Sequence, residues 1–270
     1  MRAADVSNWT GEIAVDQARC LRAEGIALLI CGTQVPAITR AQVAAATAAG
    51  MRCEAYVILR WDGDVDRRVA AARAAVRDLP VRRLWVDCED YPGVATPPPA
   101  ETRGLVAKAL AACASMPSGI YTSRRWWVTA TEDWRAPGAA GVPLWDARYV
   151  RRDGDPIPPF VPYGGWARAA MTQWHDTTAR CGVTLCLDET EDSMDEPLLD
   201  PRTTRDALAE LLRQEGVLGA RIDRVADDLR ATGAEFRRLI ALLCDGHTED
   251  ARRRLRYEMA AAGESWPDAR

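Results

Sequence analysis

Short apolar runs alternate with longer alanine-rich runs along the first 190 residues. The apolar runs predict eight β-strands, at residues 2–7, 27–33, 52–61, 83–90, 118–122, 142–149, 170–176 and 183–189. Helical patterns occupy the early gaps at 14–23, 39–49, 64–77 and 100–114, and Gly or Pro follows each as a stop signal. Strands that alternate with helices are typical of a (β/α) barrel. Because loops rich in Pro, Gly and Trp join the later strands, we expect an α/β, TIM-like barrel with helices mainly after the first five strands.

The pattern changes after Pro201. From residue 205 onward no strand-like run occurs, and large apolar residues recur at spacings of three and four, as in a heptad seam. We therefore predict two parts, a barrel over residues 1–198 and a helical C-terminal segment over residues 199–270. This segment is interpreted either as a helical hairpin packed on the barrel or as a coiled coil through which the chain forms a homo-oligomer.

The net charge of −4 provides no basic field that would hold nucleic acid or an anionic membrane surface. No window approaches the ~18 apolar residues that a membrane span needs, and the N-terminus lacks the apolar run of a signal peptide. We expect neither nucleic-acid binding nor membrane insertion, and no signal peptide.

Eight cysteines are spread along the chain, mostly inside apolar runs, without a CxxC pair or a Cys/His cluster at zinc spacing. We expect buried free thiols rather than a disulfide framework. His175 and His247 are the only histidines, so we expect no metal site.

Asp87 and Glu89 lie two residues apart in the predicted strand 83–90, so they should project to the same side as Trp85. At the C-terminal end of a barrel strand that side faces the usual position of an active site. Two carboxylates in an apolar site cannot both ionise cheaply, so one should keep its proton near neutral pH. A protonated acid beside an ionised one is the arrangement that glycosidic bond cleavage uses.

Two further acids end predicted strands: Asp5 ends the first, and Asp188 ends the last. The first and last strands are neighbours in a closed barrel, so we expect all four acids to converge on one cleft. Aromatic residues also fall at strand ends, and tryptophan offers a flat face to a sugar ring. We expect carbohydrate contact from Trp9, Trp145 and Trp174.

Five segments together resemble glycoside hydrolase family 25, the Chalaropsis-type lysozymes or muramidases, over residues 3–190. They are DVSNWTG at 5–11, LWVDCE at 84–89, GIYT at 119–122, PLWDARY at 143–149 and QWH at 173–175, followed by Gly182 and Asp188. His175 departs from the family pattern, which has glutamine after the tryptophan. The resemblance implies a barrel with helices after only the first five strands.

The resemblance also implies roles for single residues. Glu89 would be the general acid, and Asp87 would orient the 2-acetamido group of the substrate or else position water. The substrate-binding residues would be Asp5, Asp188, Tyr56, Tyr121, Trp145, Tyr149 and Trp174. The implied reaction is hydrolysis of the β-1,4 bond between N-acetylmuramic acid and N-acetylglucosamine in peptidoglycan glycan strands, and no cofactor is expected.

Two alternatives stay open. One is a catalytically weak or inactive barrel of the same family that serves as a structural or carbohydrate-binding component of a phage or cell-wall assembly. The other is a glycosidase that acts on a different polysaccharide. Without a signal peptide, a wall hydrolase of this lysin-like kind is expected to reach the wall through a holin, by cell lysis, or carried in a particle.

Overall fold

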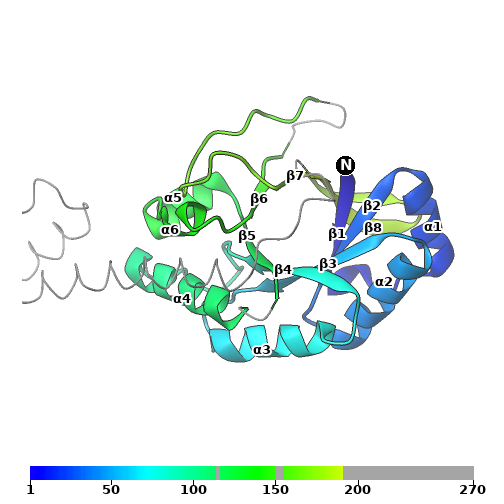
Figure 1. Cartoon of the computed structure of the whole chain (residues 1–270), viewed down its shortest axis with the longest axis horizontal. Helices are drawn as coiled ribbons and strands as arrows, with labels where there is room; N and C mark the ends of the chain where they lie inside the picture. Colours follow the sequence, from blue (N-terminus) through cyan, green and yellow to red (C-terminus); the bar gives the residue numbers. More distant parts are fainter. Residues whose placement is uncertain (114–115, 150–154, 191–270) are drawn as a thin grey trace, which may run out of the picture. The chain divides into compact units, whose positions relative to one another are not determined.

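Eight strands close into a barrel in the order of the sequence, in a computed structural model that describes residues 1–113, 116–149 and 155–190 (Figure 1). The strands are β1 Arg2–Val6, β2 Ile26–Gly32, β3 Arg52–Ile58, β4 Val81–Asp87, β5 Ser118–Thr122, β6 Leu144–Ala147, β7 Met171–Arg180 and β8 Val183–Thr190. Neighbours from β1 to β7 run parallel. The prediction of a closed α/β barrel is confirmed.

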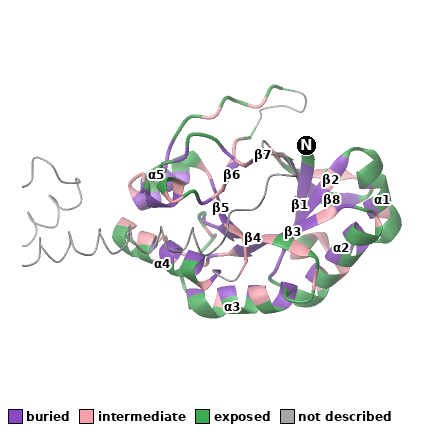
Figure 2. Ribbon diagram, viewed as in Figure 1, coloured by how far each residue is buried: buried purple, intermediate pink, exposed green. Residues whose placement is uncertain are grey.

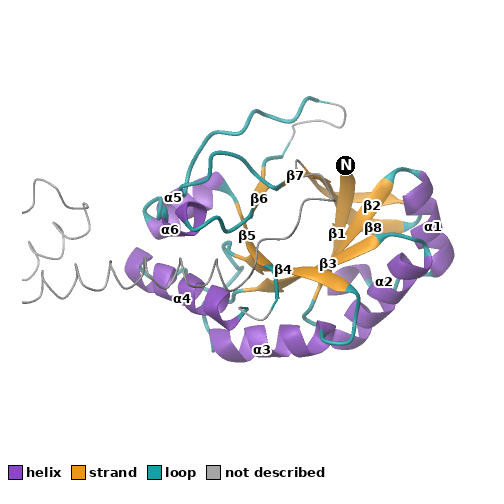
Figure 3. Ribbon diagram, viewed as in Figure 1, coloured by secondary structure: helices purple, strands orange, loops and turns teal. Residues whose placement is uncertain are grey.

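One helix or more follows each of the first five strands, as predicted, and α1 to α4 lie outside the strands (Figure 3). The helices are η1 Asn8–Thr10, α1 Val15–Ala23, α2 Pro36–Ala48, α3 Val65–Val76, α4 Pro99–Ala112, α5 Arg124–Thr131 and α6 Ala136–Ala139. Their starts follow local chemistry. Asp64 caps α3 by accepting the backbone N–H groups of Asp66 and Arg67, and a proline opens α2 and α4. Residues 155–170, in the connection from β6 to β7, form no helix.

The last strand runs against the others: β8 pairs antiparallel with both β7 and β1. Asp5 therefore lies opposite Cys186. Asp188 lies opposite Ala3, two residues closer to the start of β1. The expectation that Asp188 ends its strand at the same barrel edge as Asp5 is wrong. The side chain still reaches the barrel interior, because residues 186 and 188 alternate with the outward-facing Leu185 and Leu187.

Aromatic side chains fill the barrel interior. A buried cluster draws one or two residues from each of β1 to β7: Ala3, Leu28, Ile30, Tyr56, Trp85, Tyr121, Trp145 and Met171. Paired positions such as Tyr56 and Trp85, or Tyr121 and Trp145, face the same side of the sheet, so this cluster is the lumen. A second cluster packs the outer faces of β1, β2, β3 and β8 against α1 and α2 (Figure 2).

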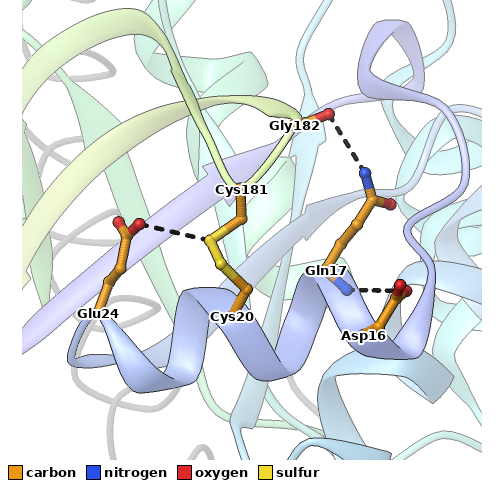
Figure 4. The surroundings of a disulfide bond; sticks show 6 residues. All are labelled: Asp16, Gln17, Cys20, Glu24, Cys181 and Gly182. Carbon is orange, nitrogen blue, oxygen red and sulfur yellow. Dashed lines mark hydrogen bonds between the residues drawn. A yellow bond between two sulfur atoms is a disulfide. The ribbon is translucent and has the colours of Figure 1, made fainter.

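A disulfide overturns part of the cysteine prediction. Cys20 on α1 is bonded to Cys181 in the turn between β7 and β8, 161 residues further along the chain (Figure 4). Glu24 Oε1 lies 3.4 Å from Cys181 Sγ, and Gln17 Nε2 donates a hydrogen bond of 3.3 Å to Gly182 O, so α1 is fastened to the β7–β8 hairpin. The remaining described cysteines are thiols, as expected: Cys31, Cys53, Cys88, Cys113 and Cys186.

The predicted helical segment 199–270 and its boundary at residue 198 lie outside the described residues and stay predictions. Among the residues that are described, no helix is long and apolar enough to cross a membrane.

Candidate active site

Asp87 is the last residue of β4 and points into the lumen, two positions beyond Trp85. The side chain is 4% exposed, and its Oδ1 has no hydrogen-bond partner among the described residues. Burial raises the pKa of Asp87 well above its ordinary value, and the nearby charges of Glu89 and Asp5 raise it further. The site therefore contains a buried carboxyl group with one oxygen that no described residue satisfies.

Glu89 follows the strand instead of belonging to it, since β4 ends at Asp87 and the predicted strand 83–90 is too long at this end. Its backbone is held from the side: Trp61 Nε1 donates to Glu89 O at 3.0 Å. Trp61 stacks on Trp126 with ring centroids 5.4 Å apart, and Trp126 Nε1 donates to Asp90 Oδ1 at 3.1 Å. Two indole N–H groups, not strand alternation, thus fix the segment that carries Glu89.

The carboxyl group of Glu89 combines accessibility with a raised pKa. The residue is exposed, yet the surrounding protein removes enough water from the carboxyl group to raise its pKa from 4.5 to about 7. The charges of Asp5 and then Asp90 add to this effect of burial. Near neutral pH a large fraction of Glu89 therefore keeps its proton while facing solvent, as a general acid must.

Asp5 and Asp188 form a carboxyl pair inside the lumen. They are 8% and 1% exposed, and Asp188 Oδ2 is buried without a hydrogen-bond partner among the described residues. Burial raises the pKa of Asp5 to about 6, although the hydrogen bond from Gln173 opposes the rise. Burial and then the charge of Asp5 raise the pKa of Asp188 well above its ordinary value.

Gln173 on β7 links the acid pair to two tyrosines, a role that the sequence analysis did not assign. Its Nε2 donates to Asp5 Oδ2 at 2.6 Å, and its Oε1 accepts from Tyr121 Oη at 2.8 Å and Tyr149 Oη at 2.7 Å. The sequence contains one indication of this role: Gln173 lies two positions from Met171, on the lumen side of a predicted strand.

Trp145 supports the acids from within the lumen. Its ring is 2% exposed and contacts Tyr56, Trp85 and Tyr121 edge-on, with centroids 6.2, 5.7 and 4.6 Å away. Its Nε1 donates to Asp188 Oδ1 at 2.8 Å. The ring therefore offers no free face to a sugar, contrary to the predicted contact, and instead anchors Asp188.

The other two tyrosines that were predicted to bind substrate, Tyr56 and Tyr149, differ in how far they are exposed to solvent. Tyr56 is 8% exposed and its pKa is raised well above the ordinary value, first by burial and then by the charges of Asp5 and Asp87. Gly32 makes room for it, because a Cβ atom at residue 32 would lie 2.9 Å from the Tyr56 hydroxyl oxygen. Tyr149 lies beyond the end of β6 and is 48% exposed.

The structure does not bring Trp174 together with these residues. Its neighbour Gln173 faces the lumen, and Trp174 itself packs against the outer cluster beside Leu185 and Leu187. Trp9, on η1 just beyond Asp5, is 91% exposed. Of the three tryptophans predicted to contact carbohydrate, only Trp9 presents an open ring.

Metal binding has one geometric candidate among the described residues, formed by Cys20, Glu24 and Cys181. The two sulfur atoms are joined in the disulfide and cannot act as thiolate ligands in this state. This group lies on α1 and at the β7–β8 turn, outside the lumen that holds the four acids.

No protein-family model matches the sequence. The chain is 25% identical over 201 residues to a curated protein described as probable GH family 25 lysozyme 3, from Dictyostelium discoideum. The match covers 68% of this chain and 39% of that protein, so the chain spans about two fifths of the length of this relative.

Solved structures share the fold at lower identity, each with a TM-score of 0.54. The CTP1L endolysin is 17% identical, with 71% of this chain and 66% of that chain covered. The spore cortex lytic enzyme SleM of Clostridium perfringens is 18% identical, with coverage of 73% and 69%. The glycosyl hydrolase 25 GHIP of Streptococcus pneumoniae, described as participating in host cell invasion, is 14% identical, with coverage of 76% and 91%.

Proposed function

This barrel is a glycoside hydrolase family 25 lysozyme-like domain, and on that premise we propose that it hydrolyses the β-1,4 bond between N-acetylmuramic acid and N-acetylglucosamine in peptidoglycan. The observation that carries the proposal is the pairing of an accessible Glu89, whose pKa is raised to about 7, with a buried Asp87 whose Oδ1 lacks a partner among the described residues. One group can give a proton to a bound sugar, and the other can accept a hydrogen bond from it.

Glu89 acts first as the general acid. Its proton passes to the glycosidic oxygen as the bond to the anomeric carbon breaks, which leaves Glu89 ionised and the leaving sugar with a hydroxyl group. Asp87 Oδ1 accepts the N–H of the 2-acetamido group and so orients its carbonyl oxygen, which bonds to the anomeric carbon as the leaving sugar departs. Water then attacks the anomeric carbon as the bond to that carbonyl oxygen breaks, and Glu89 takes the proton of the water and returns to its starting state.

Asp87 has a second potential role, in which it orients the attacking water directly. The two routes differ in stereochemistry: assistance by the acetamido group retains the configuration at the anomeric carbon, and direct attack by water inverts it. The anomer released first, measured by NMR on a chitooligosaccharide or glycan fragment, distinguishes them.

The experiment that tests the function compares wild type, Glu89→Gln and a matched control, Glu101→Gln. Glu101 is an exposed acid in the first turn of α4, outside the lumen. Wild type and Glu101→Gln should release reducing ends from purified peptidoglycan, and Glu89→Gln should release none while it remains folded. Equal activity of Glu89→Gln and wild type would remove Glu89 from the acid role.

Sugar binding without turnover is a second candidate function, and Trp9 favours it. An indole ring that is 91% exposed adds little to the stability of the fold, because most of its surface stays in water. It offers a sugar ring a flat apolar face next to the strand that carries Asp5. If folded wild type releases no reducing ends from walls of several bacteria but sediments with those walls, and Trp9→Ala abolishes sedimentation, binding is the better description.

Action at the cell wall is part of the proposal, with delivery through a holin, by lysis or in a particle. The Cys20–Cys181 bond supports a location outside reducing cytosol, because disulfides persist in oxidising compartments. Thiol labelling of the protein recovered from its working environment tests this: Cys20 and Cys181 should be protected until a reductant is added.

A further inference from the structure

Gln173 is a buried glutamine that uses both ends of its amide. Its side chain is 5% exposed, and three groups converge on it, from β5, from β1 and from the segment after β6. Tyr121 and Tyr149 donate their hydroxyl hydrogens to Oε1, which leaves Nε2 as the end that faces Asp5. The reverse orientation would set a carbonyl oxygen 2.6 Å from the carboxyl oxygen of Asp5, two acceptors in contact without a hydrogen between them.

The bond from Gln173 decides which acid of the pair carries the charge. Asp5 Oδ2 accepts from Gln173 and Asp188 Oδ1 accepts from Trp145, while Asp188 Oδ2 is buried with no partner among the described residues. A donor that stabilises ionised Asp5 leaves the proton with Asp188. The burial of the two groups agrees, since Asp188 is the more buried acid.

We propose that Gln173 is a positioning residue: its N–H keeps the negative charge of the pair on Asp5, and that charge holds the proton on Glu89. The placement of the charge on Asp5 is argued from the hydrogen bonds in the lumen. Its consequence for catalysis rests on the proposed function. Gln173 touches no reacting atom in this scheme and acts through Asp5 alone.

The groups that face Asp5 from the elements around it are acidic or neutral. They are Cys31 on β2, Tyr56 on β3, Asp87 and Glu89 at the end of β4, Tyr149 after β6, Gln173 on β7, and Cys186 and Asp188 on β8. None of these groups carries a positive charge at neutral pH, so they can stabilise an ionised Asp5 only through hydrogen bonds. Among them, Gln173 makes the largest such contribution.

The test uses the full chain with Gln173→Met, which preserves the length of the side chain and removes the N–H donor. Carboxyl carbons of aspartate and glutamate are followed by NMR as the pH is raised. We expect the Asp5 titration to move to higher pH by about one unit, and the Glu89 titration to move to lower pH, because Asp5 is then less often charged. In the reducing-end assay, the decline of kcat/KM on the alkaline side should move to lower pH together with Glu89.

The matched control is Gln42→Met. Gln42 is also fully buried, and its Nε2 donates to two backbone oxygens, of Ser7 and Gly11, at 3.0 and 2.8 Å. This variant should lose stability and leave the titrations of Asp5 and Glu89 in place. If Gln173→Met does not fold, Gln173→Glu replaces it. That variant keeps an acceptor for the tyrosines and sets a carboxyl oxygen against Asp5, so the Asp5 titration should again move to higher pH.

A folded variant at residue 173 with unchanged titrations of Asp5 and Glu89 overturns the proposal, even if its activity falls, because loss of activity alone indicates a structural role. The NMR titration does not depend on turnover. A wild-type protein that hydrolyses no wall would therefore refute the proposed function, while the arrangement of charge would still be decided by the two titrations.

Discussion

Replacing Gly119 with alanine should destabilise the barrel by about 2 kcal/mol, because the lumen has no room for a methyl group beside Trp85. Gly119 pairs with Trp85 across β4 and β5, and a Cβ atom there would lie 2.4 Å from Trp85 Cζ3 and 2.9 Å from the carbonyl oxygen of Pro143. Ordinary contacts begin near 3.4 Å, so the ring or the strand must shift by about 1 Å. The ring is 1% exposed, and its Nε1 donates to Glu54 at 2.6 Å, so it cannot turn aside without straining a buried hydrogen bond.

The matched control is Gly104→Ala, at an exposed position inside α4 where a new Cβ atom meets nothing within 4 Å. That change should stabilise the chain by up to about 1 kcal/mol through helix propensity. Urea unfolding followed by tryptophan fluorescence, at one pH for both variants and wild type, measures the two effects. A free energy of unfolding for Gly119→Ala equal to or above that of wild type would refute the description of the lumen as closely packed around Trp85.

Three further predictions concern charge, covalent linkage and the acid itself. Because the pKa of Asp5 is raised from 3.8 to about 6, the folded chain holds this proton more tightly than the unfolded chain, and Asp5 alone should cost about 3 kcal/mol of stability as the pH rises from about 4 to about 6. The raised pKa values of Asp87, Glu89 and Asp188 add to the loss. Urea unfolding across this range should show the decline, and a rise would contradict it. Reduction of the Cys20–Cys181 bond, which closes a loop of 161 residues, should lower the free energy of unfolding by about 4 kcal/mol, measured by urea unfolding with and without a thiol reductant. Trp61→Phe keeps an aromatic ring and removes the N–H that is donated to the backbone oxygen of Glu89. In the reducing-end assay, kcat should therefore fall by about tenfold while KM stays nearly constant. An unchanged kcat would show that this hydrogen bond does not position the acid.

The barrel could be predicted from the sequence because its signal is local. Each strand is a short apolar run, and each early crossover is an amphipathic helix with its own cap or stop, so the order and approximate position of eight strands follow from patterns a few residues long. Strand ends carry a weaker signal. The apolar run of β4 continues to Cys88, whose N–H still bonds Tyr121 O, but the strand ends at Asp87. Strand alternation therefore could not place Glu89, and the tryptophan pair that does place it comes from distant segments.

The direction of β8 could have been found from its turn. Cys181 and Gly182, with φ of 53° and 74°, form a two-residue connection of the kind that joins antiparallel strands. The predicted strand stopped at residue 176, which hid this hairpin. The disulfide partner of Cys181 had no comparable signal, because a separation of 161 residues leaves no spacing pattern. The acid pair shows the same limit, since Asp5 and Asp188 meet only when the barrel closes.

The energetics of the lumen favour a functional reading over a purely structural one. Asp5, Asp87 and Asp188 are all buried, and burial raises the pKa of each, so ionising any of them in the folded barrel costs free energy that an apolar or amide side chain would not. Asp5 recovers part of that cost through the hydrogen bond from Gln173, and Asp188 through the bond from Trp145. Asp87 Oδ1 and Asp188 Oδ2 recover none among the described residues. A barrel that only had to be stable would gain from asparagine or leucine at residue 87. A carboxyl oxygen left without a partner at the end of β4, next to an accessible acid with a pKa of about 7, is instead suited to a partner that arrives with the substrate.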